Sequence, residues 1–362
     1  MALTWWRLLI AAPEFNVQIT LAILHAIAWQ FAVRRLAVRV IAPWIMRRPW
    51  AARYRRRCYE TLTHGYGVRF KDEEHAFKFS SLFAAFVAIH IVGGLLCVPS
   101  LLVGQSSLTT ALAAQGALIE IGWEASDLVV RAWQLAGFAG QAGRDINPPM
   151  LVFFAVCHHT MGVSMILPMN VYFRDSRDYH ELVFLLQFGA FVAMFSQAYG
   201  YTLDVSTRGG LVRMRRAALW TFVSVLWSRG IRYVVIGARL LDAIKRAGHE
   251  RMYTGGVAGL LGMMIFNVVV IADCARRLWK FGVRTPMPIE PTHTPAPMRR
   301  LRLVDRWRGS DEELIRLFNG EGRPDGAPRP RQMSLEEVRR HRLSLPATVA
   351  RRRPAASVAR EP

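Results

Sequence analysis

Apolar windows long enough to cross a membrane recur along this chain from residue 17 to residue 281. A helix needs about 20 apolar residues to span the ~30 Å hydrocarbon core of a bilayer, and these windows are roughly 18 to 25 residues long. Backbone groups inside lipid must bond within their own segment, and no alternating strand pattern is present, so the windows favour helices. We therefore predict an all-α, polytopic membrane protein with about seven transmembrane helices, at residues 17–33, 79–103, 107–130, 149–169, 180–201, 217–241 and 255–279.

The basic residues lie mainly in the connections and predict the orientation. The chain is 52% hydrophobic yet carries a formal net charge of +21, so its apolar and basic residues must occupy different segments. Arginine and lysine crowd residues 34–78 and recur at 202–216, whereas residues 104–106 contain neither. By the positive-inside rule we expect the two basic segments and the C-terminal tail in the cytosol, and the N-terminus outside. The basic loop 242–254 is an exception to this alternation.

The third window carries three acidic side chains, Glu120, Glu124 and Asp127. Each would cost about 2.5–3.5 kcal/mol at a helix centre, so we expect this helix to insert only alongside its neighbours. Their spacing of i, i+4 and i+7 puts them on one helix face, which we call the acidic stripe. Arg229 and Arg232 form a basic pair in the sixth window. Two interpretations stay open: the stripe and the pair neutralise each other, or a carboxylate orients an imidazole or accepts its proton.

Two adjacent histidines, His158 and His159, lie near the middle of the fourth window. Neighbouring residues point about 100° apart on a helix, so one ring can face a cavity while the other bonds a neighbouring helix. A neutral imidazole can serve as a general base or as a nucleophile toward an activated acyl group. Structural hydrogen bonding, ligand binding and catalysis all remain open for this pair. As candidate catalytic residues we take His158 and His159, with Asp127 and Glu124 as their partners.

Polar residues elsewhere in the windows indicate a polar-lined interior. The remaining histidines form no second cluster of the kind that a di-iron site needs, and the four cysteines lack paired spacing, so we predict no metal site. Ion-coupled transport is disfavoured because no inverted repeat is evident. The candidate substrate-binding residues are His90, Asn170, Arg229, Arg232 and Asn267.

The composition changes sharply after Phe281, where closely spaced prolines stop any helix. We predict three segments: residues 1–77 form the first span and a basic cytosolic loop, residues 78–281 form a transmembrane domain, and residues 282–362 form a largely disordered Pro/Arg-rich cytosolic tail. A capping-box pattern at Ser310 predicts one short amphipathic helix in the tail. The tail's arginines are expected either to be solvated or to bind anionic lipid headgroups.

Four local features occur in order between residues 78 and 281. They are Lys78-Phe79-Ser80-Ser81 before the window with His90, then Glu124-Ala125-Ser126-Asp127, then His158-His159 followed by Asn170, and lastly Trp227-Ser228-Arg229 before a window ending in Arg276-Arg277-Leu278. In order and spacing these features resemble the TLC-domain family of lipid metabolism, which includes the ceramide synthases. The resemblance implies a barrel of six helices around a lipid-sized cavity, with one helix in front, in the endoplasmic reticulum membrane.

The resemblance also implies an activity. His158 and His159 match the family pair that takes part in moving an acyl group from acyl-CoA to the amine of a sphingoid base. Acyl-CoA would then be a co-substrate, with no tightly bound cofactor, and its phosphates would meet Arg213, Arg215 and Arg216. The family's later His-Asp element has no counterpart here, so a non-enzymatic protein that binds, senses or escorts lipids is the alternative. We expect membrane lipids and no nucleic acid as partners, and leave a homo-oligomer open.

Overall fold

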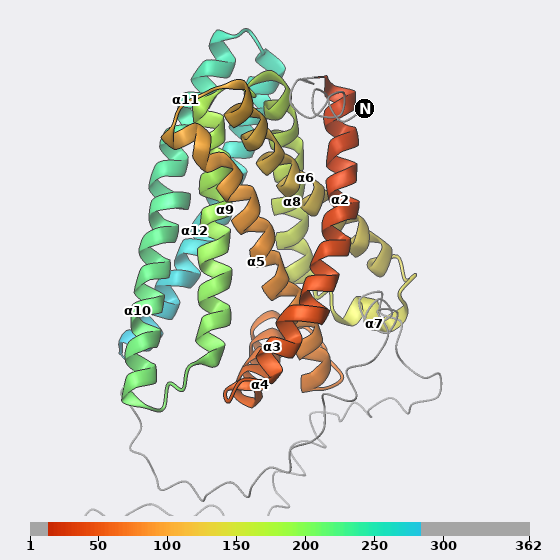
Figure 1. Cartoon of the computed structure of the whole chain (residues 1–362), viewed down its shortest axis with the longest axis vertical. Helices are drawn as coiled ribbons and strands as arrows, with labels where there is room; N and C mark the ends of the chain where they lie inside the picture. Colours follow the sequence, from red (N-terminus) through yellow and green to blue (C-terminus); the bar gives the residue numbers. More distant parts are fainter. Residues whose placement is uncertain (1–13, 284–362) are drawn as a thin grey trace, which may run out of the picture. The chain divides into compact units, whose positions relative to one another are not determined.

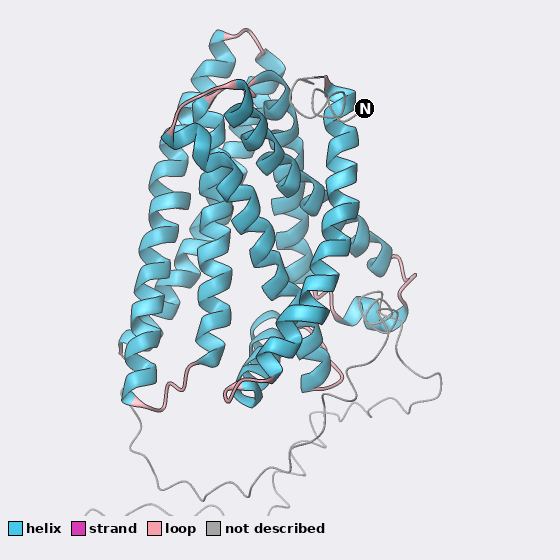
Figure 2. Ribbon diagram, viewed as in Figure 1, coloured by secondary structure: helices cyan, strands magenta, loops and turns pink. Residues whose placement is uncertain are grey.

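A computed structural model describes residues 14–283, and these residues are helical throughout, with short connections and no strand (Figures 1 and 2). The all-α prediction is confirmed for this part of the chain. All described residues belong to one compact unit. The expectations for the tail and its short helix lie outside the described residues. The helices are α2 (Phe15–Leu36), η1 (Ala37–Ile41), α3 (Ala42–Met46), α4 (Ala51–Glu60), η2 (Thr61–Gly65), α5 (Glu73–Leu102), α6 (Ser107–Leu135), α7 (Gly140–Asp145), α8 (Pro149–Tyr172), α9 (Arg177–Thr202), α10 (Arg208–Val225), η3 (Leu226–Arg232), α11 (Tyr233–Arg246) and α12 (Glu250–Gly282).

Each apolar window of the sequence lies, to within one residue, inside a long helix, counting α10, η3 and α11 as one continuous helix. Five helical segments are long and apolar enough to cross a membrane. The other two long helices carry the acidic stripe, in α6, and the basic pair, in η3, and these charges lower their hydropathy. The five apolar segments are Phe15–Met46, Glu73–Leu102, Pro149–Tyr172, Arg177–Thr202 and Glu250–Gly282.

Six of the long helices contact one another in a closed ring. In order around the ring these are α5, α6, α8, α12, the α10–η3–α11 helix and α9, which returns to α5. The helix α2 packs on α6, with further contacts to α5 and α8. Gly122 allows this approach, because a Cβ there would lie 2.7 Å from the carbonyl oxygen of Ala22. Such backbone contact at small residues is typical of helix pairs in membranes.

The connections alternate between two ends of the helices. At one end, the Gln105 side chain donates to the carbonyl oxygen of Asp175 at 2.5 Å. At the other end, Arg53 donates to the carbonyl oxygen of Thr202 at 3.0 Å, and Arg215 to that of Phe281 at 2.9 Å. The basic segments 34–78 and 202–216 therefore share an end, as the orientation argument requires. We call it the basic end.

The sequence boundary expected between residues 77 and 78 lies inside α5, which begins at Glu73. Asp72 caps this helix, since its carboxylate accepts a hydrogen bond from the backbone N–H of His75 at 2.8 Å. A second local feature bears on the site: η3 is a π-helical segment within an otherwise α-helical run, and it carries Arg229. π-Helical segments are frequent at functional sites because they change which residues share a face.

Candidate functional site

The acidic stripe on α6 faces histidines of α5 and α8 rather than the basic pair Arg229 and Arg232. Its three carboxylates are all buried, and each lies beside an imidazole from α5 or α8. Among residues 14–283, no ion pair joins the stripe to Arg229 or Arg232, so the interpretation of mutual neutralisation is not realised as direct pairing. The three histidine–carboxylate pairs are His90 Nδ1 to Glu120 Oε2 at 3.2 Å, His158 Nε2 to Glu124 Oε1 at 3.7 Å and His159 Nδ1 to Asp127 Oδ2 at 3.1 Å.

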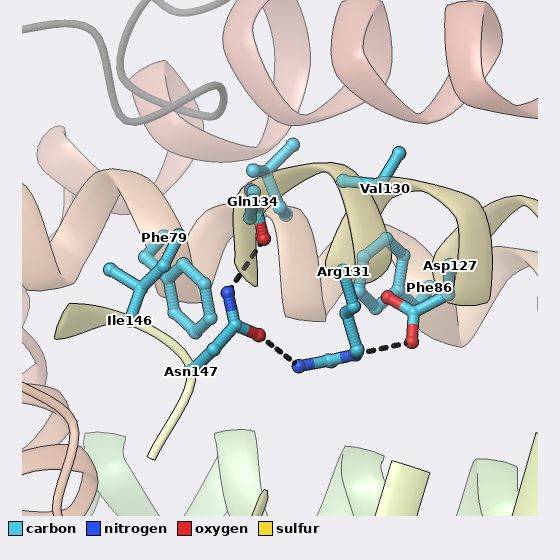
Figure 3. A pocket seen from close by; sticks show the side chains of 9 residues that line it. Phe79, Phe86, Asp127, Val130, Arg131, Gln134, Ile146 and Asn147 are labelled. Atoms are coloured by element: carbon cyan, nitrogen blue, oxygen red, sulfur yellow. Dashed lines mark hydrogen bonds and ion pairs between the residues drawn. The ribbon is translucent and has the colours of Figure 1, made fainter. Parts of the chain in front are cut away.

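The pair formed by His159 and Asp127 continues into a hydrogen-bonded network. Arg131, one turn after Asp127, donates from Nε to Asp127 Oδ2 at 2.6 Å. Its Nη1 donates to Asn147 Oδ1 at 2.8 Å, and Asn147 Nδ2 donates to Gln134 Oε1 at 2.7 Å (Figure 3). This network holds the Asp127 carboxylate in place and compensates its charge, which buried ions require.

A small cavity lies against the same network. Its volume is about 20 Å³, and Asp127, Arg131 and Asn147 line it together with Phe79 and Phe86 (Figure 3). A cavity needs about 10–15 Å³ to hold one water molecule, and a buried water needs two to four polar partners. The space therefore suits a single water beside the Asp127 carboxylate and is too small for an acyl chain.

Glu124 occupies the most enclosed position of the stripe, with only 2% of its side chain exposed. Its carboxylate lies directly over Gly162 of α8, where an added Cβ would overlap Oε2. That oxygen has no hydrogen-bond partner among the described residues. On the other side, the ring of His158 stacks on Phe266 of α12 at a centroid distance of 4.4 Å. His158 is thus held between α6 and α12.

Both histidines of the pair keep some accessible surface. The side chains of His158 and His159 are 19% and 15% exposed, respectively. Their ring centroids are 5.3 Å apart. The two imidazoles therefore contact different carboxylates and can both be reached from outside the helix packing.

Arg229 and Asn267 form a second polar contact, between η3 and α12. The Arg229 Nη1 atom donates to Asn267 Oδ1 at 3.3 Å, and Asn267 Nδ2 donates back to the Arg229 carbonyl oxygen at 3.0 Å. Nη2 donates to the carbonyl oxygen of Leu186 in α9 at 2.7 Å. Arg229 is buried and passes close to Gly189, where a Cβ would meet Arg229 Nε at 2.7 Å. The guanidinium therefore ties three helices of the ring together.

The structure does not bring Arg232 and Asn170 to the histidine–carboxylate cluster. Arg232 pairs with Glu181 of α9 at 2.5 Å. Asn170 lies three turns beyond His159 on α8, where it donates to Gln18 at 2.7 Å and accepts from the Tyr179 hydroxyl at 3.2 Å. Their roles as substrate-binding residues stay predictions, while the observed contacts of Asn170 join α2, α8 and α9.

Three residues of the cluster could also hold a metal ion. Glu124, His158 and His159 each offer one ligand atom, and these atoms lie within 4.8 Å of one another. In a tetrahedral zinc site with bonds of about 2.0–2.2 Å, the ligand atoms lie about 3.3–3.6 Å from one another, a separation that falls within this limit. The sequence prediction of no metal site rested on the spacing of histidines and cysteines alone. It did not include Glu124, which α6 brings next to the two histidines of α8.

Sequence reasoning missed the residues that complete the site. Arg131 and Gln134 continue the spacing of the acidic stripe along α6 and could have been found by extending it. Asn147, in the connection before α8, and Phe266, on α12, carry no such signal. Comparisons of the chain with known protein families, with curated proteins and with solved structures find no match.

Proposed function

We propose that this chain is a multi-pass membrane protein of lipid metabolism that transfers an acyl group from acyl-CoA to the amine of a sphingoid base. The observation that carries the proposal is the pairing of His159 with the buried carboxylate of Asp127 at 3.1 Å. Two features of the fold support it: five apolar helical segments of membrane-spanning length, and the closed ring of six helices, which agrees with a barrel like that of TLC-domain proteins.

His159 is proposed to act as the general base. A carboxylate on one ring nitrogen holds the proton there and leaves the lone pair on the other nitrogen. Asp127 lies 3.1 Å from Nδ1, so the proposal assigns the ring proton to Nδ1 and the basic lone pair to Nε2. Arg131 keeps the carboxylate in place through its 2.6 Å hydrogen bond. The 15% exposure of His159 leaves room for contact with a substrate.

The proposed reaction needs no further reagent. The neutral amine nitrogen attacks the thioester carbonyl of acyl-CoA while Nε2 of His159 takes up the amine proton. The carbon–sulfur bond then breaks, the CoA thiolate leaves, and the imidazolium returns the proton to its sulfur. The products are an amide and free CoA, with no net uptake or release of protons.

His158 is proposed to position the amine rather than to take its proton. Its Nε2 lies 3.7 Å from Glu124, and its ring is fixed by stacking on Phe266. Arg229 and Asn267 hydrogen-bond to each other, and Arg229 also donates to the Leu186 carbonyl oxygen. These contacts support a role in holding the ring of helices together.

A second candidate is a protein that binds or escorts lipids without chemistry. It is favoured by the cavity beside Asp127 and Arg131, whose volume of about 20 Å³ fits one water and no acyl chain. In that case the three histidine–carboxylate pairs stabilise helix packing, and the lipid binds elsewhere.

The test uses the purified full-length chain in detergent with a sphingoid base and long-chain acyl-CoA, with amide formation followed by mass spectrometry. Wild type should form product, and His159→Ala should lower the rate about 10²–10⁴-fold at nearly unchanged thermal stability, because the Asp127–Arg131 bond remains. His25→Ala is the matched control, since it removes a histidine bonded to a polar side chain, Gln115, outside the cluster. A wild-type chain that binds the lipids but forms no amide would favour the second candidate.

We further propose an endoplasmic reticulum location with the basic end and the tail in the cytosol. The shared end of the basic segments 34–78 and 202–216 supports this orientation. An N-glycosylation acceptor introduced near Gly326 should stay unmodified in cells. Modification there would place the tail in the lumen and reverse the orientation.

A further inference from the structure

A groove runs between α9 and α10, which lie side by side (Figure 1), apart from the histidine–carboxylate cluster. Its volume is about 420 Å³, far larger than the cavity at Asp127. The wall from α9 presents Phe191, Phe195 and Tyr199, which recur every four residues and so share one helix face.

The opposite wall, from α10, changes from basic to apolar along the helix. Arg213 and Arg216 lie in its first turns, next to the basic end, and Trp220 lies one turn further from that end. On α9, Tyr199 lies near the basic end, and Phe191 lies eight residues earlier, about 12 Å deeper along the helix axis. The groove is therefore basic at one end and aromatic along the rest.

The two arginines of the groove, Arg213 and Arg216, have no acidic partner among residues 14–283, and both are exposed. The one hydrogen bond of Arg213 runs from Nε to the carbonyl oxygen of Gly209, which leaves its terminal nitrogens available. The acidic residue in the α9–α10 connection, Asp204, already pairs with Arg53 at 3.0 Å.

Two aromatic side chains of the groove are largely exposed. Phe195 and Trp220 are 55% and 63% exposed, respectively. Large apolar side chains exposed on membrane helices face the lipid acyl chains, so an acyl chain can lie along this wall. Basic pockets between membrane helices on the cytosolic side are the usual sites for anionic lipid headgroups.

We propose that this groove binds one anionic phospholipid from the leaflet at the basic end. The phosphate would lie between the guanidinium groups of Arg213 and Arg216, and one acyl chain would lie along Phe195 and Trp220 toward the membrane centre. Charge complementarity selects this occupant over a neutral lipid, and the apolar wall selects it over a soluble phosphate compound. The groove lies apart from His159 and Asp127, so phospholipid binding there does not depend on acyl transfer. In this proposal Arg213 and Arg216 bind a lipid phosphate instead of the acyl-CoA phosphates expected from the sequence.

Native mass spectrometry of the full-length chain in detergent tests the proposal, with phosphatidylglycerol and phosphatidylcholine of identical acyl chains as probes. Wild type should bind phosphatidylglycerol more tightly. Arg213→Gln with Arg216→Gln should weaken that binding roughly 10- to 30-fold, as expected for two cations near a membrane surface. Phosphatidylcholine binding should fall much less, because the choline cation offsets the charge of its phosphate. The matched control is Arg208→Gln with Arg276→Gln, which removes the same charge from exposed positions at the basic end outside the groove.

A second variant tests the apolar part without altering charge. Ala217 lines the groove, so Ala217→Trp should fill it and reduce binding of phosphatidylglycerol at least tenfold. This variant also decides the matter if the double arginine variant fails to fold. Equal affinity of wild type for the two lipids, an equal loss in the control variant, or full binding by Ala217→Trp would each overturn the proposal.

Discussion

Nδ1 of His159 lies 3.1 Å from Oδ2 of Asp127, and that same oxygen accepts the 2.6 Å hydrogen bond from Arg131. The carboxylate therefore contacts both His159 and Arg131; in the proposed function it orients the imidazole, and it also compensates the charge of Arg131. Substituting Asp127 alone would change activity and stability together. Combining it with a substitution of Arg131 separates the two effects.

Asp127→Asn is expected to destabilise the chain by about 3–5 kcal/mol, because it leaves the Arg131 guanidinium buried without a carboxylate. Adding Arg131→Gln removes that uncompensated charge and should restore most of the stability. Amide formation should stay low in the double variant, since His159 still lacks its carboxylate. Thermal unfolding in detergent and product formation are the two readouts. Recovery of activity together with stability would mean that Asp127 acts only through folding.

Gly162→Ala is expected to cost about 1–3 kcal/mol, because the new Cβ would overlap the Glu124 carboxylate. In a Glu124→Ala background the obstacle is gone, so the same substitution should cost much less. Gly255→Ala on α12 is the control: no atom lies within 4 Å of its Cβ, and removing a helical glycine should stabilise by about 0.5–1 kcal/mol. Thermal unfolding of the single and double variants measures these differences. Additive effects of Gly162→Ala and Glu124→Ala would contradict the observed contact.

Arg229→Gln and Arg232→Gln should differ strongly although the two residues are three apart on one helix. Loss of Arg229 removes the donor to Asn267 Oδ1 and a second donor to the Leu186 carbonyl oxygen, and a buried acceptor without its donor costs about 1–3 kcal/mol. Arg232 pairs with Glu181 and is 36% exposed, so its loss should cost about 0–1 kcal/mol. Thermal unfolding of the two variants in the same detergent compares them, and similar destabilisation would argue against the buried role of Arg229.

The periodicity of the sequence was sufficient to predict the long helices and the acidic stripe, because both depend on residues close together in the chain. Periodicity did not predict the partner of Glu120, and pairing of Glu124 with the histidine pair was one of two interpretations left open. Whether a stripe meets histidine or arginine depends on which helices pack together, and α6 contacts α5 and α8 here.

Helical spacing alone does not distinguish the environments of Arg229 and Arg232. The π-helical geometry of η3 changes the angle between successive residues, and in the structure the two side chains reach different partners on α9. The resemblance to the TLC-domain family drew attention to His158, His159 and Asp127, which do lie together in the structure, but the function of that cluster stays a prediction.

Cys58 provides a test of the packing at the basic end, away from the membrane spans. It is fully buried on α4 against Tyr54 and Phe77, and burial raises the pKa of its thiol to about 12. Only the thiolate reacts with maleimides, so at pH 8 the reactive fraction should be about a thousandfold smaller than for an ordinary cysteine. Glu60→Cys places a thiol at an exposed position of the same helix and is the control. Peptide mass spectrometry after brief labelling should find residue 60 modified and Cys58 intact until denaturant is added. Rapid labelling of Cys58 in the folded chain would show that α4 does not pack on α5 as described.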